Sequence, residues 1–184
     1  MTNIGYLLSS LVHVAWNFTT NNNFAQISPI LTRSAQPNPK HLKEIVEKYK
    51  TKKIINLRGS NPESKWYQDE QETCQKLGLE LINIRLTATA MPSQKNILEI
   101  IDAARKIDSQ THIHCKGGAE RTGLFAGIYL LLNDFKPKEA LKQVSLRFGV
   151  LNPYQRRFFR AYKKSYPQSL ESWVQQTYDP TLPR

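Results

Sequence analysis

The chain lacks the features that mark several other protein classes. It has two cysteines in 184 residues, Cys74 and Cys115, which is too few for the repeated disulfide framework of a small secreted protein. Low-complexity linkers and internal repeats are also missing from the sequence. We therefore expect one domain in a reducing, cytoplasmic compartment, because 184 residues suffice for one core but not comfortably for two.

Charged side chains are absent from the first 32 residues, and Arg33 is the first one. This segment includes "IGYLLSSLVHVAWNF", which is shorter than the ~20 residues of a membrane span and follows no basic region of a signal peptide. We separate an uncharged N-terminal lead, residues 1–23, from a domain over residues 24–184. The lead fits the remnant of an anchor, an interfacial segment or a flap packed on the domain, and we favour the flap.

Acidic residues are outnumbered, and the formal net charge is +11. Such a surface attracts phosphorylated small molecules, phosphoproteins, nucleic acid or an acidic membrane. The segment "RRFFRAYKK" mixes basic and aromatic residues as a nucleic-acid or membrane patch does, yet Phe158, Phe159 and Tyr162 also fit the buried face of an ordinary helix. We favour the buried face. Nucleic acid is then not an expected partner, whereas a membrane surface stays open through the lead or the basic face.

The order of the expected elements predicts the fold class. Asn38 and Pro39 are typical of a helix start, and short branched segments alternate with helical patterns after them. The expected strands are 52–57, 79–86 and 111–115. The expected helices begin at 39 and within 61–78, surround 97–104, and then cover 121–135, 136–149, 152–166 and 168–178. This alternation predicts a single-domain α/β fold with a mainly parallel sheet of four or five strands and helices on both faces.

The stretch "HCKGGAERTG" forms the turn from the strand 111–115 into a nearly all-apolar helix. It therefore lies at the carboxyl edge of the sheet, where the ligands of such folds bind. A loop containing Gly117 and Gly118 can direct its amides inward, and the helix that follows adds the positive end of its dipole. The sequence predicts a site for an anion the size of phosphate.

Three side chains in this stretch predict nucleophilic chemistry. The amides and dipole that bind a dianion also stabilise the thiolate of Cys115, which makes this residue a nucleophile near neutral pH. The planar fork of Arg121 can grip two phosphoryl oxygens, and the hydroxyl of Thr122 can donate to the sulfur as it leaves. The predicted reaction is in-line displacement at phosphorus through a phosphocysteine, followed by hydrolysis. The structural alternative is a buried cysteine followed by a glycine turn.

A metal site is not expected. His112, His114 and Cys115 lie on one strand, and the sequence has no second cluster to complete a tetrahedron. We expect no cofactor either.

The segment "HCKGGAERTG" resembles the signature loop of the cysteine-dependent protein tyrosine and dual-specificity phosphatases, in particular their compact bacterial, fungal and plant branch. The segments "RSAQP" (33–37) and "INLRG" (55–59) also resemble segments of that branch, so the likeness covers roughly residues 24–165. It implies a phosphatase-like catalytic domain over residues 24–184. Residue by residue, the likeness assigns the nucleophile to Cys115, the phosphate-clamping arginine to Arg121 and the hydroxyl after it to Thr122. The phosphate-binding loop corresponds to Lys116, Gly117, Gly118, Ala119 and Glu120.

The chain departs from this family at the general acid. The family usually places an aspartate on a loop upstream of the cysteine, but the matching loop "LTATAMPS" (86–93) has no Asp or Glu. Asp102 and Asp108 are expected on the solvent side of the next helix and its end. Glu120 remains, at a position where certain phosphoinositide phosphatases carry an acidic residue. It either protonates the leaving oxygen or holds the loop in shape, and a third alternative is a substrate that requires no acid.

Other residues allow two interpretations each. Arg58 either reaches the substrate or pairs with a neighbouring helix, and Lys116 either binds a second phosphate or is solvated. Cys74 is expected in the core. The function expected is a phosphatase that acts on phosphotyrosine or phosphoserine proteins or on inositol phosphates. The alternative is a pseudophosphatase that binds phosphorylated partners without turning them over. The sequence does not indicate an oligomeric state.

Overall fold

The computed structural model describes residues 22–181. The expected N-terminal lead, residues 1–23, lies outside the described residues apart from Asn22 and Asn23, so its packing stays a prediction. Within residues 22–181, no helix is both long and apolar enough to span a membrane.

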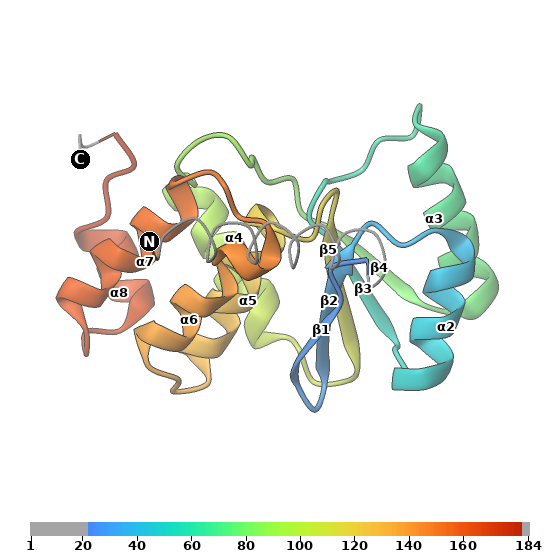
Figure 1. Ribbon diagram of the computed structural model, residues 1–184, viewed down its shortest axis with the longest axis horizontal. Coiled ribbons are helices and arrows are strands. Elements are labelled where there is room, and N and C mark those ends of the chain that lie inside the picture. The colour runs from blue at the N-terminus through green and yellow to red at the C-terminus, as the bar shows by residue number, and fades with distance from the viewer. Residues whose placement is uncertain (1–21, 182–184) are drawn as a thin grey trace, which may run out of the picture.

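A five-stranded sheet in the order β1-β2-β5-β3-β4 lies at the centre of the fold (Figure 1). The strands β2 (Leu31–Ala35), β5 (Thr111–Cys115), β3 (Lys53–Asn56) and β4 (Glu80–Asn83) are parallel. Only β1 (Ala25–Ser28), which pairs with β2 at one edge, runs antiparallel. The predicted mainly parallel α/β sheet is confirmed.

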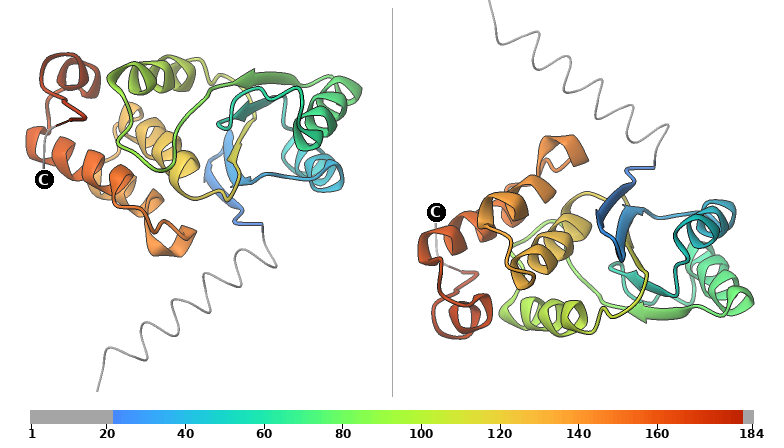
Figure 2. Two further views of the ribbon diagram at one scale, coloured as in Figure 1. Left: turned by 90° about the horizontal axis from the view of Figure 1, so that it is seen from above. Right: turned by 90° about the horizontal axis from the view of Figure 1, so that it is seen from below.

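Helices cover both faces of this sheet, as Figures 1 and 2 show. The helices α2 (Pro39–Tyr49) and α3 (Lys65–Leu77) lie on one face. The other face carries α4 (Gln94–Arg105), α5 (Glu120–Leu132), α6 (Pro137–Gln143), α7 (Tyr154–Ser165) and α8 (Leu170–Gln176).

The two faces differ in the amount of apolar side chain that they bury. Leu42, Ile54 and Cys74 form a small cluster under α2 and α3, which confirms the core position expected for Cys74. A much larger cluster fills the other face and includes both Phe158 and Phe159. The predicted burial of the aromatic face of α7 is therefore confirmed.

Local signals in the sequence fix several element boundaries. The Asn38 side chain accepts a hydrogen bond from the His41 amide at 2.9 Å and caps α2, and Gly78, with φ +64°, ends α3 in the left-handed conformation. In α5, residues 122–130 are all buried, as the all-apolar pattern predicts.

The helix predicted over 136–149 is two elements. The first is α6, which ends at Gln143, and the second is a separate 3₁₀ turn, η1 (Leu146–Phe148). The Gln143 carbonyl accepts a hydrogen bond from the side chain of Arg33 at 3.1 Å, and this contact with β2 replaces the next turn of helix. The strands β1 and β2 have no counterpart among the strands located from the sequence, because β2, "LTRSA", is buried on both faces and carries no apolar alternation.

Candidate active site

The loop between β5 and α5 contains the residues predicted to bind phosphate. Cys115, the last residue of β5, is only 2% exposed, and α5 begins at Glu120. Gly118 has φ +66°, and a Cβ on this residue would lie 2.5 Å from the Ala35 amide nitrogen. Glycine is therefore required here twice, by the left-handed backbone and by the close approach of β2.

Three successive carbonyl groups of the loop are held from outside. The Gln36 amide donates to the Lys116 carbonyl at 3.3 Å, and the Asn23 side chain donates to the Gly117 carbonyl at 3.0 Å. The Gly118 carbonyl accepts from Arg33 at 2.6 Å. In a trans peptide the N–H points opposite to the carbonyl, so the amides of residues 117, 118 and 119 are directed away from these supports. This geometry favours the predicted inward-facing amides.

Arg33 is fully buried behind this loop. Its Nη1 donates to the Gln143 side-chain oxygen at 2.9 Å, and its guanidinium carbon lies 3.9 Å from the centre of the Phe148 ring. Burial lowers the pKa of Arg33 to about 9, while the nearby Cys115 opposes this shift and Arg147 adds to it. Burying a cation is costly, and an anion in the loop offsets part of that cost.

Arg121 and Thr122 occupy the first turn of α5. Thr122 is fully buried, and its Oγ1 has no hydrogen-bond partner within residues 22–181. The Nε of Arg121 is likewise buried and unpartnered in the described part of the chain. Unpaired buried polar groups are uncommon in native proteins, and a bound anion is one explanation for them.

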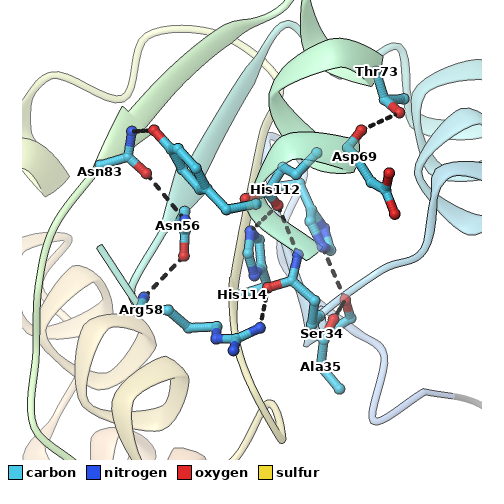
Figure 3. A network of polar contacts seen from close by, with 12 residues as sticks. Ser34, Ala35, Asn56, Arg58, Asp69, Thr73, Asn83, His112 and His114 are labelled. Carbon is cyan, nitrogen blue, oxygen red and sulfur yellow. Dashed lines mark hydrogen bonds and ion pairs between the residues drawn. The ribbon is translucent and has the colours of Figure 1, made fainter. Parts of the chain in front are cut away.

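Arg58 follows β3 at the same edge of the sheet. Its amide donates to the Asn56 side chain at 2.9 Å (Figure 3). Its guanidinium carbon lies 3.3 Å from the centre of the Trp66 ring. Burial and the charge of Arg121 lower the pKa of Arg58, whereas Glu70 and Cys115 raise it. Arg58 is therefore within electrostatic reach of both predicted catalytic groups. It stacks on a ring of α3 instead of forming the helix salt bridge considered as an alternative.

A chain of polar contacts joins Arg58 to the strand that ends in the cysteine. Arg58 Nη1 donates to Gln36 Oε1 at 3.0 Å, and Gln36 Nε2 donates to Glu70 Oε1 at 2.9 Å. The same Glu70 oxygen lies 2.6 Å from Nε2 of His114, directly before Cys115 (Figure 3). Both side chains of this contact are buried. The network fixes the position of the Arg58 guanidinium relative to β5.

Glu120 contacts the C-terminal half of the chain. Its Oε1 accepts a hydrogen bond from Asn152 Nδ2 at 3.4 Å, and the same nitrogen donates to the Ala88 carbonyl at 3.4 Å. Asn152 thus connects Glu120 to the loop that lacks an aspartate. The two downstream aspartates lie elsewhere, as predicted: Asp102 and Asp108 form exposed ion pairs with Lys106 and Lys53.

The remaining predicted positions are less engaged. Lys116 is exposed at the loop and Ala119 is buried beneath it. Burial, with a contribution from Glu70, raises the pKa of the Cys74 thiol to about 12, so this second cysteine is a poor nucleophile. Within residues 22–181 no cluster of three or more His, Cys, Asp or Glu side chains could hold a metal ion.

Sequence reasoning assigned no role to several residues of this site. The phosphate-binding loop is supported by Asn23 and Arg33. The Arg58 guanidinium is held by a network that includes Gln36, Trp66 and Glu70. The resemblance of "RSAQP" to a family segment pointed to two of them, but it did not say what they contact.

Known proteins share this fold and this sequence pattern. The sequence model of the family described as "DSP-PTPase phosphatase fused to NAD+ Kinase" matches residues 11–157. The catalytic domain of the PP-IP phosphatase SIW14 from S. cerevisiae, solved with citrate, is 19% identical with a TM-score of 0.64, over 76% of this chain and 85% of that one.

Two further solved structures are similar. TpbA from P. aeruginosa, solved with phosphotyrosine, is 19% identical with a TM-score of 0.58, over 84% of this chain and 88% of TpbA. Tk-PTP in its active form is 20% identical with a TM-score of 0.60, over 77% of this chain and 97% of Tk-PTP. At these identities the structures establish a common fold. A search among curated protein sequences finds no match.

Proposed function

The chain belongs to this family of DSP-type phosphatases, and from that premise we propose that it hydrolyses phosphate monoesters through a phosphocysteine at Cys115. The observation that carries the proposal is the outward anchoring of three loop carbonyls, by Gln36, Asn23 and Arg33. This anchoring leaves the opposing amides available for a phosphoryl dianion next to the thiol.

The proposed reaction begins with the dianion bound by the loop amides and by the guanidinium of Arg121. The Cys115 sulfur attacks phosphorus in line, the new S–P bond forms, and the P–O bond to the leaving group breaks. Glu120 supplies the proton to the leaving oxygen. Water then attacks phosphorus and gives a proton to the Glu120 carboxylate, which restores the acid. The S–P bond breaks and inorganic phosphate leaves, while the Thr122 hydroxyl donates a hydrogen bond to the departing thiolate.

The direct test is hydrolysis of p-nitrophenyl phosphate and its inhibition by vanadate. Cys115→Ser should remove all turnover, because no other group in the scheme can attack phosphorus. Cys74→Ser is the matched control, since this thiol is buried in the small apolar cluster under α2 and α3. This variant should hydrolyse p-nitrophenyl phosphate at the wild-type rate. Activity of Cys115→Ser above a few per cent would exclude the phosphocysteine.

A substitution of Arg121 tests whether its guanidinium clamps the phosphoryl group. Lysine at this position keeps the charge but loses the two-pronged geometry, so Arg121→Lys should lower kcat at least ~100-fold. A nearly normal rate would mean that the arginine is structural.

A second candidate, a pseudophosphatase that binds phosphorylated partners, is favoured by the absence of an acid between residues 86 and 93. An aryl phosphate separates the two candidates, because its leaving group hardly requires protonation. A folded wild-type protein that binds vanadate but leaves this substrate intact would favour the pseudophosphatase.

Glu120 is tested by comparing two leaving groups. If it is the acid, Glu120→Gln should cost ~100-fold or more on an alkyl phosphate and much less on an aryl phosphate. The acid-dependent limb of the pH profile should also weaken on the alkyl substrate. Equal losses on both substrates would instead assign Glu120 to holding the loop through Asn152.

The proposed substrates are phosphotyrosine or phosphoserine proteins or inositol phosphates. Arg58 is the proposed contact for a second anionic group, because Trp66 and Gln36 hold its guanidinium near Arg121. A panel of these phosphates should show a higher KM for Arg58→Ala only on substrates with more than one anionic group. Lys116, exposed at the same loop, is the proposed additional cation.

A further inference from the structure

The outer face of α7 carries an unusual set of charges. Its sequence, "YQRRFFRAYKKS", has five basic residues and no acidic one. Phe158, Phe159 and Tyr162 are buried against the core, so the cations lie on the remaining surface. The basic residues are Arg156, Arg157, Arg160, Lys163 and Lys164. Among residues 22–181, none of these five forms an ion pair.

Each of the other α-helices among residues 22–181 contains at least one acidic residue. Ion pairs one turn apart form in α3 and α6, and between Asp102 of α4 and Lys106, which directly follows that helix, at 2.7 Å. In α7, by contrast, Arg160 has like charges three and four residues away on both sides, an arrangement that destabilises an isolated helix. A helix with five cations and no compensating acid points to an anionic partner for that helix.

Exposed apolar side chains gather in the same part of the chain. The large apolar residues that are exposed within residues 22–181 all fall between 135 and 166, and they are Phe135, Leu146, Leu151 and Tyr166. Leu151 is the most exposed at 78%, and it precedes α7 by three residues. Tyr166, at 45%, follows the helix directly. The cationic helix therefore has an exposed apolar residue at each end.

We propose that α7 docks on an anionic lipid membrane, with its cations on the headgroups and Leu151 and Tyr166 entering the interface at its two ends. Long Lys and Arg side chains suit this position, because their stems reach past apolar atoms while their charges stay among the headgroups. Tyrosine is enriched at membrane interfaces for the same reason. A nucleic acid would satisfy the cations but not the exposed leucine.

The location of the surface fits a membrane-facing enzyme. Residues 133–166 contain nine basic and two acidic residues, and so carry most of the net charge of +11. Figure 1 shows α7 and α8 at the end of the molecule away from α2 and α3. Asn152, next to Leu151, contacts Glu120 of the catalytic loop. Docking would therefore bring the active-site loop close to the lipid surface.

The test measures binding of the full chain to vesicles of neutral phosphatidylcholine and to vesicles with added phosphatidylserine. Wild type should bind the anionic vesicles at least ~10-fold more tightly, and 0.5 M salt should remove most of the difference. Because residues 1–21 are present in every protein compared, any binding that they cause is common to all of them.

Charge reversal on α7 should remove the preference. The triple variant Arg160→Glu, Lys163→Glu, Lys164→Glu should lose at least ~10-fold in binding to anionic vesicles and nothing on neutral ones. The matched control reverses three exposed lysines elsewhere and changes the net charge equally: Lys40→Glu, Lys43→Glu and Lys52→Glu. Its binding should stay within ~3-fold of wild type. Both triple variants should keep the wild-type rate on a soluble aryl phosphate, which shows that they are folded.

Leu151→Ser and Tyr166→Ser should each weaken binding to anionic vesicles without a change of charge. Equal losses in the two triple variants would overturn the proposal in favour of non-specific attraction. Undiminished binding of the α7 triple variant would overturn it outright. Stronger, α7-dependent binding to an oligonucleotide than to anionic vesicles would assign the surface to nucleic acid. Because Cys115→Ser should bind vesicles as wild type does, failure of this proposal and failure of the phosphatase reaction are separate results.

Discussion

The two faces of the sheet carry out different tasks with different residues. The face under α4 to α8 buries a large continuous apolar cluster, with Phe158, Trp173 and Tyr178 in mutual ring contact at 5.2 to 5.5 Å. The face under α2 and α3 has a small apolar cluster and a network of buried polar groups. In that network the His112 ring contacts the Thr32 hydroxyl at 2.9 Å and the Ser34 hydroxyl at 3.0 Å, and Figure 3 shows the contact with Ser34.

The difference indicates where stability and chemistry come from. Removing large apolar area from water is the main stabilising contribution in a domain of this size. Buried polar networks contribute less net free energy, but they fix side chains in one geometry. We therefore expect the face under α4 to α8 to determine the free energy of unfolding. The polar face under α2 and α3 should determine the rate of phosphate hydrolysis.

Truncation of the large core should have the largest effect on stability. Phe158→Ala should lower the free energy of unfolding by about 3–5 kcal/mol, because a fully buried ring is lost and a cavity remains. Leu42→Ala in the small cluster should cost nearer to about 2 kcal/mol. Urea unfolding measures both. Similar losses for the two variants would contradict the division between the faces.

Arg33 is the exception on the large face, and replacing it should affect both properties. Arg33→Lys keeps a cation but loses donors to the Gly118 carbonyl or to Gln143, so we expect a loss of about 2 kcal/mol in stability. Because the loop amides lose their alignment, kcat should also fall at least ~10-fold. Thermal unfolding and p-nitrophenyl phosphate kinetics together measure these effects. A less stable variant with an unchanged kcat would limit Arg33 to a structural role.

On the polar face, a small change should alter the rate more than the stability. Glu70→Gln retains an acceptor for His114 but removes the buried negative charge, so stability should change by less than about 1.5 kcal/mol. We expect kcat/KM to fall ~10-fold and its pH profile to shift, because the charge behind Cys115 changes. An unchanged pH profile would show that the network only packs the helix.

The smallest effect should be a dependence of stability on pH. Burial, together with the neighbouring His114, lowers the pKa of His112 from 6.5 to about 3. Between these values the unfolded chain binds one proton more than the folded chain, so stability falls as the pH decreases. His112→Gln should reduce this loss by about 1 kcal/mol between pH 7 and pH 5.5, as urea unfolding at the two pH values can show. Parallel losses in wild type and variant would assign the pH dependence to other groups.

The sequence located the parts of the protein that local rules determine. The helix from Pro39, the strand before Cys115 and the all-apolar helix after it follow from caps, glycines and periodicity. The loop could be recognised because its residues are consecutive. The carbonyl supports could not, since Asn23 and Gly117 are 94 residues apart and meet only in the folded chain.

The strand β2 shows why other parts could not be predicted. Thr32, Arg33 and Ser34 are polar, yet all three are buried because His112 and the catalytic loop supply their partners. Periodicity detects only strands with an apolar face. In the same way, nothing local to "SKWYQDE" indicates that Trp66 contacts Arg58, which follows β3, or that Glu70 contacts His114 in β5.

The seating of Gly118 against β2 has a consequence for the order of folding. The catalytic loop takes its shape only when β2 lies beside β5, and the partners Thr32 and His112 are 80 residues apart. Contacts at such long sequence separation form late, because the intervening chain must first be closed into a loop. Catalytic competence should therefore return only with the last, global step of refolding, after the helices have regained their circular dichroism.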